Sequence, residues 1–389
     1  MGPINPHVEI NVAGVVHNYQ VIREMAEARG ITLTVVTKAL TGYEPLIDAL
    51  VGAGAGSIGE AHLANLAAEK DMDVEKWMIR PPMPSQVRDV VRYADVSLNT
   101  DATVVAMLGQ AAEKAPYSYQ NYLLSPLEKA RVKKGTHKVI LMVESGDRRE
   151  GIMPEDLVRY AGMALGSPGI ELYGIGTEFG CVSDVVPSRE SMEEFASLVK
   201  DVEDYWGIEL PVVSGGSSNG LLMLAEGTLP PRINNLRVGE SILTGRVANY
   251  RTPIPGAFLD PFTLSAEIIE INEKPSQPVG PRAPGEIPVT SDPRFPDNGV
   301  RRRALVAVGK QDVDIHHLTP LNPGVQILEG SSDVFVADVT DGVVPSFGDE
   351  VRPYRVGDVL TFSMDYFAIL PAMVSPFVQK VTSDQFFVA

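Results

Sequence analysis

The sequence has 389 residues, which is too long for one ordinary core and predicts two domains. Its 44% hydrophobic and 21% charged residues are typical of a soluble globular protein. Acidic residues outnumber basic ones by 50 to 33, and a surface that acidic argues against nucleic acid or an anionic membrane as a partner. Cys181 is the only cysteine, so no intramolecular disulfide is expected. No signal-peptide segment or membrane-length apolar run occurs, and we expect a cytoplasmic protein.

The first elements in the chain are a short strand and an amphipathic helix. Residues 8–12 alternate between apolar and polar, and residues 13–29 carry apolar side chains at helical spacing. Five β-favouring residues at 33–37 then lead directly into Lys38. Such a run predicts a strand buried on both faces, which puts Lys38 at its carboxyl end, where α/β folds place their chemistry. An amine in a partly desolvated pocket there can form a Schiff base, whereas an ordinary lysine would reach into solvent.

A strand-and-helix unit then repeats along the chain. Apolar segments fall at 33–37, 56–59, 77–80, 95–99, 139–143, 172–176, 211–214 and 235–239. Helical patterns follow the first seven of the eight, at 43–53, 60–70, 84–93, 101–114, 154–165, 188–206 and 218–226. This alternation predicts an α/β fold with a parallel sheet, and eight units fit a closed (β/α)₈ TIM-type barrel. A doubly wound open sheet is the alternative, but it usually has a glycine-rich turn where Lys38 stands.

The remaining segments do not follow the strand-and-helix pattern of the repeat. Residues 115–137, with Tyr117, Tyr119 and Tyr122, predict an inserted surface loop with a helical piece. After residue 250, proline and glycine separate short β-type runs at 265–271, 304–308, 334–339 and 359–364. We therefore expect a barrel at residues 1–250 and a smaller all-β domain at residues 251–389, with a long loop at 274–299.

Polar residues follow the predicted barrel strands. Strand seven ends in Ser214-Gly215-Gly216-Ser217-Ser218, and the eighth contains Arg237 and leads into Gly239 and Glu240. Barrels commonly hold a phosphate at these two strand ends, on main-chain N–H groups and hydroxyls that small residues leave open. A Schiff-base lysine together with a phosphate cradle indicates pyridoxal 5′-phosphate (PLP). A barrel aldolase acting on a sugar phosphate would share both features.

Several motifs carry a family resemblance over nearly the whole chain. The chain resembles the alanine racemase superfamily of PLP enzymes, and within it the ornithine racemase branch. The blocks that carry the resemblance are 37–38, 141–151, 174–177, 214–218, 234–241, 309–314 and 330–333. The resemblance implies an isomerase that interconverts the L- and D-enantiomers of an amino acid by moving a proton at Cα. Ornithine or a similar basic amino acid is the expected substrate.

The resemblance also implies roles for individual residues of the barrel. Lys38 matches the lysine that forms the Schiff base with the cofactor and moves a proton on one face of the substrate. Arg237 matches the arginine that donates a hydrogen bond to the pyridine nitrogen. A guanidinium is always a donor, so it would keep that nitrogen unprotonated and weaken the ring as an electron sink. Arg149 matches an arginine near the substrate carboxylate.

Further positions are expected around the cofactor phosphate and in the partner subunit. The residues matched to phosphate-binding positions, with the two glycines of the cradle, are Ser214, Gly215, Gly216, Gly239, Glu240 through its N–H, and Tyr366. Ser332 and Asp333 match a segment of the second domain that reaches the active site of the partner subunit. The resemblance therefore implies a head-to-tail homodimer with composite active sites.

Two departures from the family pattern affect these expectations. Glu178 stands where alanine racemases have a histidine beside the cofactor ring, and this carboxylate, or that of Glu150, is a candidate for binding a substrate ammonium. Residues 274–290 contain no tyrosine to act as the second base, for which Asp333, Lys310 and the pair His316-His317 are candidates.

Two other functions are compatible with the same cofactor. A PLP-dependent D-amino-acid lyase or aldolase usually has a metal site in the β-domain, and the sequence predicts no such site. A non-catalytic PLP carrier is generally a lone barrel, which the predicted second domain argues against.

Overall fold

The computed structural model describes residues 5–117, 123–288, 292–344 and 351–383. It divides into two compact units: residues 14–259, and residues 1–13 together with 260–389. The sequence-based boundary at 250/251 precedes the structural one. In addition, the first thirteen residues group with the second unit because their strand pairs there.

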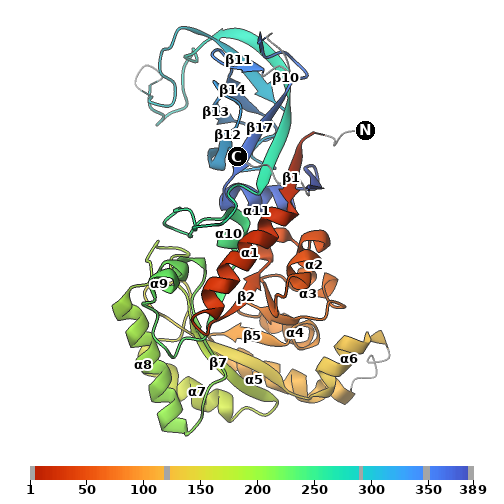
Figure 1. Ribbon diagram of the computed structural model, residues 1–389, viewed down its shortest axis with the longest axis vertical. Coiled ribbons are helices and arrows are strands. Elements are labelled where there is room, and N and C mark those ends of the chain that lie inside the picture. Colours follow the sequence, from red (N-terminus) through yellow and green to blue (C-terminus); the bar gives the residue numbers. More distant parts are fainter. Residues whose placement is uncertain (1–4, 118–122, 289–291, 345–350, 384–389) are drawn as a thin grey trace. The chain divides into compact units, whose positions relative to one another are not determined.

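The first unit is a closed barrel of eight parallel strands (Figure 1). Its strands are β2 (Thr32–Val36), β3 (Ser57–Glu60), β4 (Glu75–Met78), β5 (Val96–Asn99), β6 (His137–Val143), β7 (Ile170–Thr177), β8 (Val212–Gly215) and β9 (Asn235–Val238). Each strand pairs in parallel with the next, and β9 closes the ring against β2 with Leu33 opposite Leu236. The predicted (β/α)₈ barrel and all eight predicted strands are confirmed.

Helices follow the strands and surround the barrel (Figure 1). They are α1 (Val12–Glu27), α2 (Glu44–Gly52), α3 (Leu63–Ala68), α4 (Val87–Tyr93), α5 (Ala102–Lys114), α6 (Pro126–Lys133), α7 (Leu157–Leu165), α8 (Arg189–Trp206), α9 (Leu221–Glu226) and α10 (Glu240–Thr244). Helix α6 and the short 3₁₀ turn Ala115–Tyr117 occupy the predicted insertion, as expected. Tyr119 and Tyr122 lie outside the described residues.

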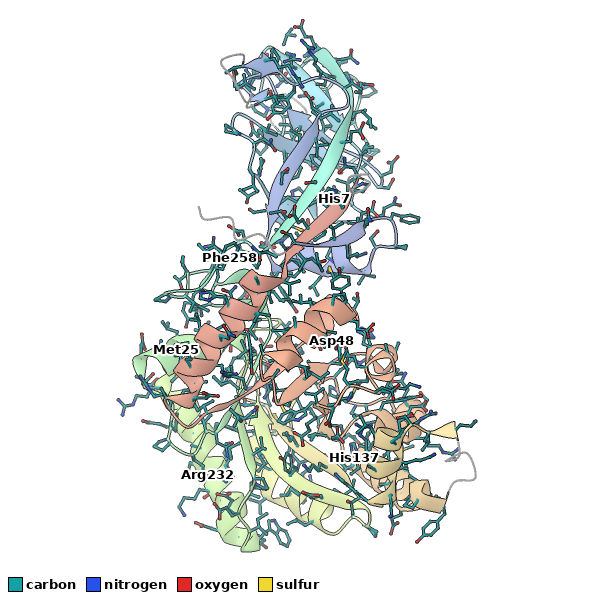
Figure 2. The ribbon with its side chains drawn as sticks, turned by 45° about the vertical axis from the view of Figure 1, so that its right-hand side comes forward. His7, Met25, Asp48, His137, Arg232 and Phe258 are labelled. Atoms are coloured by element: carbon teal, nitrogen blue, oxygen red, sulfur yellow. The ribbon has the colours of Figure 1, made fainter. Side chains whose placement is uncertain are left out.

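The barrel strands are buried on both faces, as their continuous apolar runs predict. The helix-facing side contains Val139, Leu141 and Val143 of β6, packed in one cluster with Val199 of α8. Side chains alternate along a strand, so the intervening residues of β6 face the barrel interior. They belong to a separate cluster formed by Trp77, Val96, Leu98, Ile140, Met142 and Val212. Figure 2 shows the side chains, with Asp48 labelled on α2 and His137 at the start of β6.

The second unit is built on an eight-stranded sheet in which β1 (His7–Asn11) takes part. The others are β10 (Phe262–Pro275), β11 (Val300–Val306), β12 (Leu318–Pro320), β13 (Gln326–Gly330), β14 (Phe335–Asp338), β17 (Val359–Met364) and β18 (Gln379–Ser383). β15 (Val343–Val344) and β16 (Arg352–Pro353) form a separate pair. The four predicted β-type runs correspond to β10, β11, β14 and β17.

Strand β1 joins this sheet through its apolar side chains. Val8 and Ile10 are fully buried, and they stand opposite Leu264 and Phe262 of β10 in an antiparallel register. On its other edge, β1 runs parallel to β18. One described helix, α11 (Tyr366–Val374), interrupts the strands of this β-domain and was not expected from the sequence. The predicted loop at 274–299 lies between β10 and β11, and residues 289–291 within it are outside the described residues.

Candidate active site

Lys38 lies directly beyond the carboxyl end of β2, as the first residue of the 3₁₀ turn Lys38–Leu40. Its side chain is half-buried, and within the described part of the chain no hydrogen bond or ion pair engages its amine. The turn closes at Thr41, whose φ of 51° lies in the left-handed region. An amine without a protein partner at this end of a parallel barrel is available to react with a carbonyl compound.

The residue before Lys38 is anchored to the neighbouring strand. The Thr37 hydroxyl donates to Glu60 Oε1 at 3.0 Å, and its N–H donates to the Gly59 carbonyl at 2.9 Å. Glu60 is fully buried at the end of β3, and burial raises the pKa of its carboxyl despite hydrogen bonds from Asn65, Thr37 and the main chain. These contacts fix the backbone from which Lys38 projects.

Arg237 is a buried cation on β9, with a side chain that is 3% exposed. Its Nη1 donates to the hydroxyl of Ser214 on β8. Its Nη2 donates to the Thr177 carbonyl at 2.7 Å and to Glu178 Oε2 at 2.9 Å. A buried charge is tolerated when it is paired and hydrogen-bonded, and this guanidinium is both.

Glu178 follows β7 and is held by both of its carboxylate oxygens. Oε2 accepts from Arg237, and Oε1 accepts from the N–H of Phe179 at 3.1 Å. The predicted role of Glu178 as a substrate ligand remains a prediction, because these contacts within the chain do not test it. Its pairing with Arg237 was not anticipated, since sequence spacing gives no sign of which residues at the strand ends come into contact.

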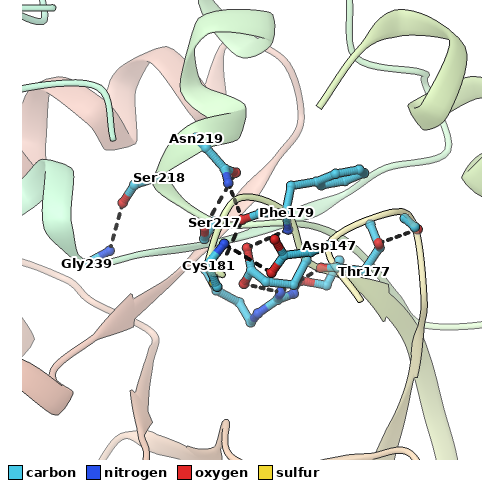
Figure 3. Close-up of polar contacts among 12 residues, drawn as sticks. Asp147, Thr177, Phe179, Cys181, Ser217, Ser218, Asn219 and Gly239 are labelled. Carbon is cyan, nitrogen blue, oxygen red and sulfur yellow. Dashed lines mark hydrogen bonds and ion pairs between the residues drawn. The ribbon is translucent and has the colours of Figure 1, made fainter. Parts of the chain in front are cut away.

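A carboxylate ties together the loops that follow β6 and β7 (Figure 3). Asp147 accepts hydrogen bonds from the N–H groups of Cys181 (3.1 Å), Val182 (3.2 Å) and Ser183 (2.9 Å), and from the Ser183 hydroxyl (2.7 Å). Burial acts to raise the pKa of Asp147, but these hydrogen bonds outweigh it and lower the pKa. The loop that bears Arg149 is thereby fixed to the loop that follows β7.

Arg149 itself projects from the exposed part of this loop. Its Nη2 donates to Glu150 Oε1 at 2.6 Å, and its Nε donates to Oε2 of the same carboxylate. Desolvation lowers the pKa of Arg149, but the Glu150 hydrogen bond and the charges of Glu150 and Glu178 more than offset it and raise the pKa. A guanidinium in this position is a permanent cation suited to a carboxylate.

The turns after β8 and β9, where a phosphate cradle was predicted, contact each other through Ser218 and Gly239 (Figure 3). The Ser218 hydroxyl accepts from the N–H groups of Gly239 at 3.3 Å and Ser241 at 3.2 Å. A Cβ at Gly239 would lie 2.8 Å from the Val36 carbonyl oxygen, so only glycine lets this turn pass close to β2. Gly216 has a φ of 109°, which turns the chain sharply after β8.

Ser214, which the sequence also predicts for the phosphate, has other hydrogen-bond partners. Its hydroxyl is fully buried and donates to Asn235 Oδ1 at 2.6 Å while accepting from Arg237. Ser218 is the better candidate for a phosphate contact, although the sequence alone does not distinguish it within the Ser-Gly-Gly-Ser-Ser run. The only sign in the sequence is that Ser218 follows the two glycines.

These residues fit the cofactor expected from the sequence. Small residues, hydroxyls and main-chain N–H groups around Ser218 and Gly239 are suited to a phosphate, and the amine of Lys38 is suited to an aldehyde. Arg237 has N–H groups beyond those already engaged, so it can still donate to a ring nitrogen.

Comparisons with known proteins agree with this geometry. Residues 10–246 match the family described as "Alanine racemase, N-terminal domain". The chain belongs to this family.

Two relatives match it along almost their whole length. The ornithine racemase of Acetoanaerobium sticklandii is 33% identical over 379 residues, covering 96% of this chain and 99% of the relative. The lysine racemase of Thermotoga maritima is 35% identical over 380 residues, covering 97% and 98%. Both are amino-acid racemases, and this member of the alanine racemase family is accordingly an amino-acid racemase, which is an isomerase.

A solved structure agrees with the fold. The alanine racemase from Streptomyces coelicolor has a TM-score of 0.69 at 19% identity, covering 97% of this chain and 98% of the other. Proteins of the alanine racemase family are typically PLP-dependent.

The second unit contains the remaining predicted site residues. Ser332 and Asp333 lie in the exposed turn between β13 and β14, where the Asp333 carboxylate accepts from the hydroxyls of Ser331 (3.0 Å) and Ser332 (3.2 Å). These hydrogen bonds lower the pKa of Asp333. Tyr366 is the first residue of α11. The roles predicted for these residues remain predictions.

The candidates for the second base have defined partners within the same unit. Lys310 pairs with Glu329 at 2.7 Å, and His317 Nδ1 lies 2.7 Å from an oxygen of Asp365. Neither contact distinguishes a base from a structural residue. Within the described residues, no three or more His, Cys, Asp or Glu side chains are placed to hold a metal ion. No described helix is both long and apolar enough to cross a membrane.

Proposed function

We propose that this protein is a PLP-dependent racemase of a basic amino acid, with ornithine and lysine as the first substrates to test. The observation that carries the proposal is full-length similarity to two racemases, one of ornithine and one of lysine. The amine of Lys38 at the end of β2, which has no hydrogen-bond or ion-pair partner among the described residues, supports it independently.

In this proposal each of the site residues of the barrel has a separate role in binding or in proton transfer. When bound, PLP supplies an electron-withdrawing ring that acidifies the Cα–H of an attached amino acid. Lys38 takes or returns the proton on one face of that carbon. Arg149 orients the substrate carboxylate, and Arg237 donates to the ring nitrogen. Ser218 and the N–H groups at Gly239 and Glu240 bind the phosphate.

The Lys38 amine is prepared for proton transfer by its surroundings. It has no competing partner among the described side chains, and the Thr37–Glu60 hydrogen bond fixes its backbone. Because the backbone is fixed and the amine is not engaged elsewhere, the amine can reach a substrate without first breaking another contact. A group on the other face must complete the exchange, and a homodimer in which Asp333 contributes to the partner's site remains a prediction.

The decisive test measures the amounts of the L- and D-enantiomers of each amino acid, and not only the loss of the starting amino acid. The purified protein, supplied with PLP, is incubated with L-ornithine, L-lysine, L-alanine and D-threonine, and the products are separated by chiral chromatography. We expect D-ornithine or D-lysine to accumulate until both enantiomers are equal, with no loss of total amino acid. Breakdown of D-threonine without racemisation would instead support the lyase alternative.

Two variants test whether Lys38 is the lysine that binds the cofactor. Lys38→Ala is expected to abolish turnover and the visible absorbance of bound cofactor, since both require the amine. Lys70→Ala is the matched control, because Lys70 is a partly exposed lysine of the same unit whose ion pair among the described residues is with Asp71. Borohydride reduction followed by peptide mass analysis should place the cofactor on Lys38. A Lys38→Ala protein with wild-type absorbance would contradict the assignment.

A further inference from the structure

The guanidinium of Arg237 is hydrogen-bonded to residues at the ends of two other barrel strands. Ser214 of β8 accepts from Nη1. Thr177 and Glu178, at the end of β7, both accept from Nη2, at 2.7 Å and 2.9 Å. A guanidinium has five N–H donors, so three are engaged here and, among the described residues, two remain for a further acceptor.

The contact with Ser214 has a fixed direction. The Ser214 hydroxyl donates to Asn235 Oδ1 at 2.6 Å, which leaves only its lone pairs for Arg237. The Asn235 amide in turn donates to the Thr34 hydroxyl at 3.1 Å. This buried chain of hydrogen bonds orients one side of the guanidinium without contributing charge.

Glu178 contributes the charge on the other side. Its side chain is 16% exposed, its Oε2 is bound to Arg237, and its Oε1 is held by the N–H of Phe179. A carboxylate held at both oxygens cannot swing away from its partner without breaking a second hydrogen bond. Arg237 and Glu178 therefore form a fixed pair with no net charge.

The charge of Glu178 also acts on the surroundings of Lys38. Burial, and then the charge of Glu178, raise the pKa of the Cys181 thiol to about 11, whereas the charge of Lys38 acts on the same thiol in the opposite direction. Lys38 and Glu178 are thus within electrostatic reach of one side chain. In general, an anion favours the charged form of a cationic group nearby.

We propose that Glu178 is a positioning residue that acts on the cofactor through Arg237, by orienting the guanidinium and by cancelling its charge beside the ring nitrogen. The inference rests on the proposed function, because it takes Arg237 as the partner of that nitrogen. A compensated guanidinium donates a hydrogen bond while presenting less positive potential to the ring than an isolated one.

The competing role for Glu178 is direct binding of a substrate ammonium. That role affects only substrates with a side-chain amine, and only when they are bound. An effect through Arg237 instead changes the cofactor before any substrate is added, and it changes turnover of every amino acid. The two roles therefore differ in the substrate-free protein.

The experiment is a pH titration of the visible absorbance of the PLP-loaded protein without substrate. Glu178→Gln removes the anion but keeps an oxygen acceptor, and Glu178→Asp keeps the anion. Glu203→Gln is the matched control: Glu203 also pairs with an arginine, Arg232, and accepts from the N–H of Leu210 before β8 begins, at the other end of the barrel. Figure 2 labels Arg232.

Glu178→Gln should lower the titration midpoint by about one pH unit, because the charge of Arg237 would then be uncompensated and would disfavour a protonated linkage at Lys38. Glu178→Asp and Glu203→Gln should keep the wild-type midpoint. Glu178→His, which also removes the anion, should give the same decrease and replaces the glutamine variant if that variant does not fold.

Three results would overturn the inference. An unchanged midpoint in Glu178→Gln would show that the carboxylate does not act on the cofactor. A higher KM for ornithine and lysine only, with the midpoint unchanged, would assign Glu178 to the substrate. A wild-type protein that shows no visible band with PLP would refute the proposed function itself, and the inference with it.

Discussion

Replacing Glu69 with glutamine should stabilise the barrel at neutral and alkaline pH. Glu69 follows α3, is 1% exposed, and has no hydrogen-bond partner for either carboxylate oxygen among the described residues. Burial, reinforced by the charge of Glu60 and opposed by that of Lys76, raises the pKa of Glu69 from 4.5 to about 8. The folded protein therefore keeps this carboxyl protonated at neutral pH.

The size of the effect follows from the difference in pKa between the folded and unfolded states. Because the folded value is the higher one, the stability contribution is complete below pH 4.5 and is lost as the pH rises towards 8. At about 1.4 kcal/mol per pH unit, the loss is about 3 kcal/mol at pH 7 and about 5 kcal/mol above pH 8. Glutamine does not titrate, so Glu69→Gln should remove this loss.

Urea unfolding at several pH values measures the effect of Glu69→Gln on the unfolding free energy. The two tryptophans, Trp77 on β4 and Trp206 on α8, both lie in the barrel unit and report on its unfolding by fluorescence. The gain in unfolding free energy for Glu69→Gln should grow between pH 5 and pH 8.5. Asp48→Asn, at an exposed position on α2, is the control and should show no such growth. A gain independent of pH would refute the reasoning.

Two further substitutions test the loops around the site. Asp147→Asn exchanges an anion for an amide that cannot accept every hydrogen bond from residues 181–183. Because the loops would then shift, the variant should have a kcat/KM reduced by about tenfold to a hundredfold. Unchanged initial rates in a normally folded variant would contradict this. Gly239→Ala places a Cβ 2.8 Å from the Val36 carbonyl oxygen, and it should weaken PLP binding by about tenfold or more, at about 1–3 kcal/mol of overpacking. Fluorescence titration with PLP measures this affinity, and wild-type binding would show that the turn is not part of the cradle.

Local sequence patterns were sufficient for the barrel. Each strand is a short apolar run, because both of its faces are buried, and turn residues or helical spacing follow it. The same patterns placed Lys38 at a strand end. In the second domain, α11 was missed because its residues 366–374 are apolar on all sides and contain Pro371, so they show no helical periodicity.

Contacts between distant segments could not be predicted in this way. Alternation identifies residues 8–12 as a strand but does not say which sheet it joins. Likewise, Ser214 and Ser218 are equivalent as hydroxyls in a small-residue run, and only the fold turns one towards Arg237 and the other towards Gly239. The Arg237–Glu178 pair depends on two strand ends that are far apart in sequence.

The pairing of β1 sets the order in which the second domain can be completed. His7 stands opposite Gln379 in a parallel register, so the first described strand to leave the ribosome pairs with the last. The opposite edge of β1 must also wait, because its partner β10 follows the entire barrel. Val8 and Ile10 are therefore exposed on unpaired edges while the barrel is being synthesised, which is when a nascent chain is most prone to aggregate. Expressing residues 260–389 alone would leave β10 and β18 without the strand that pairs with both of them, and residues 5–13 supplied as a peptide should bind in its place.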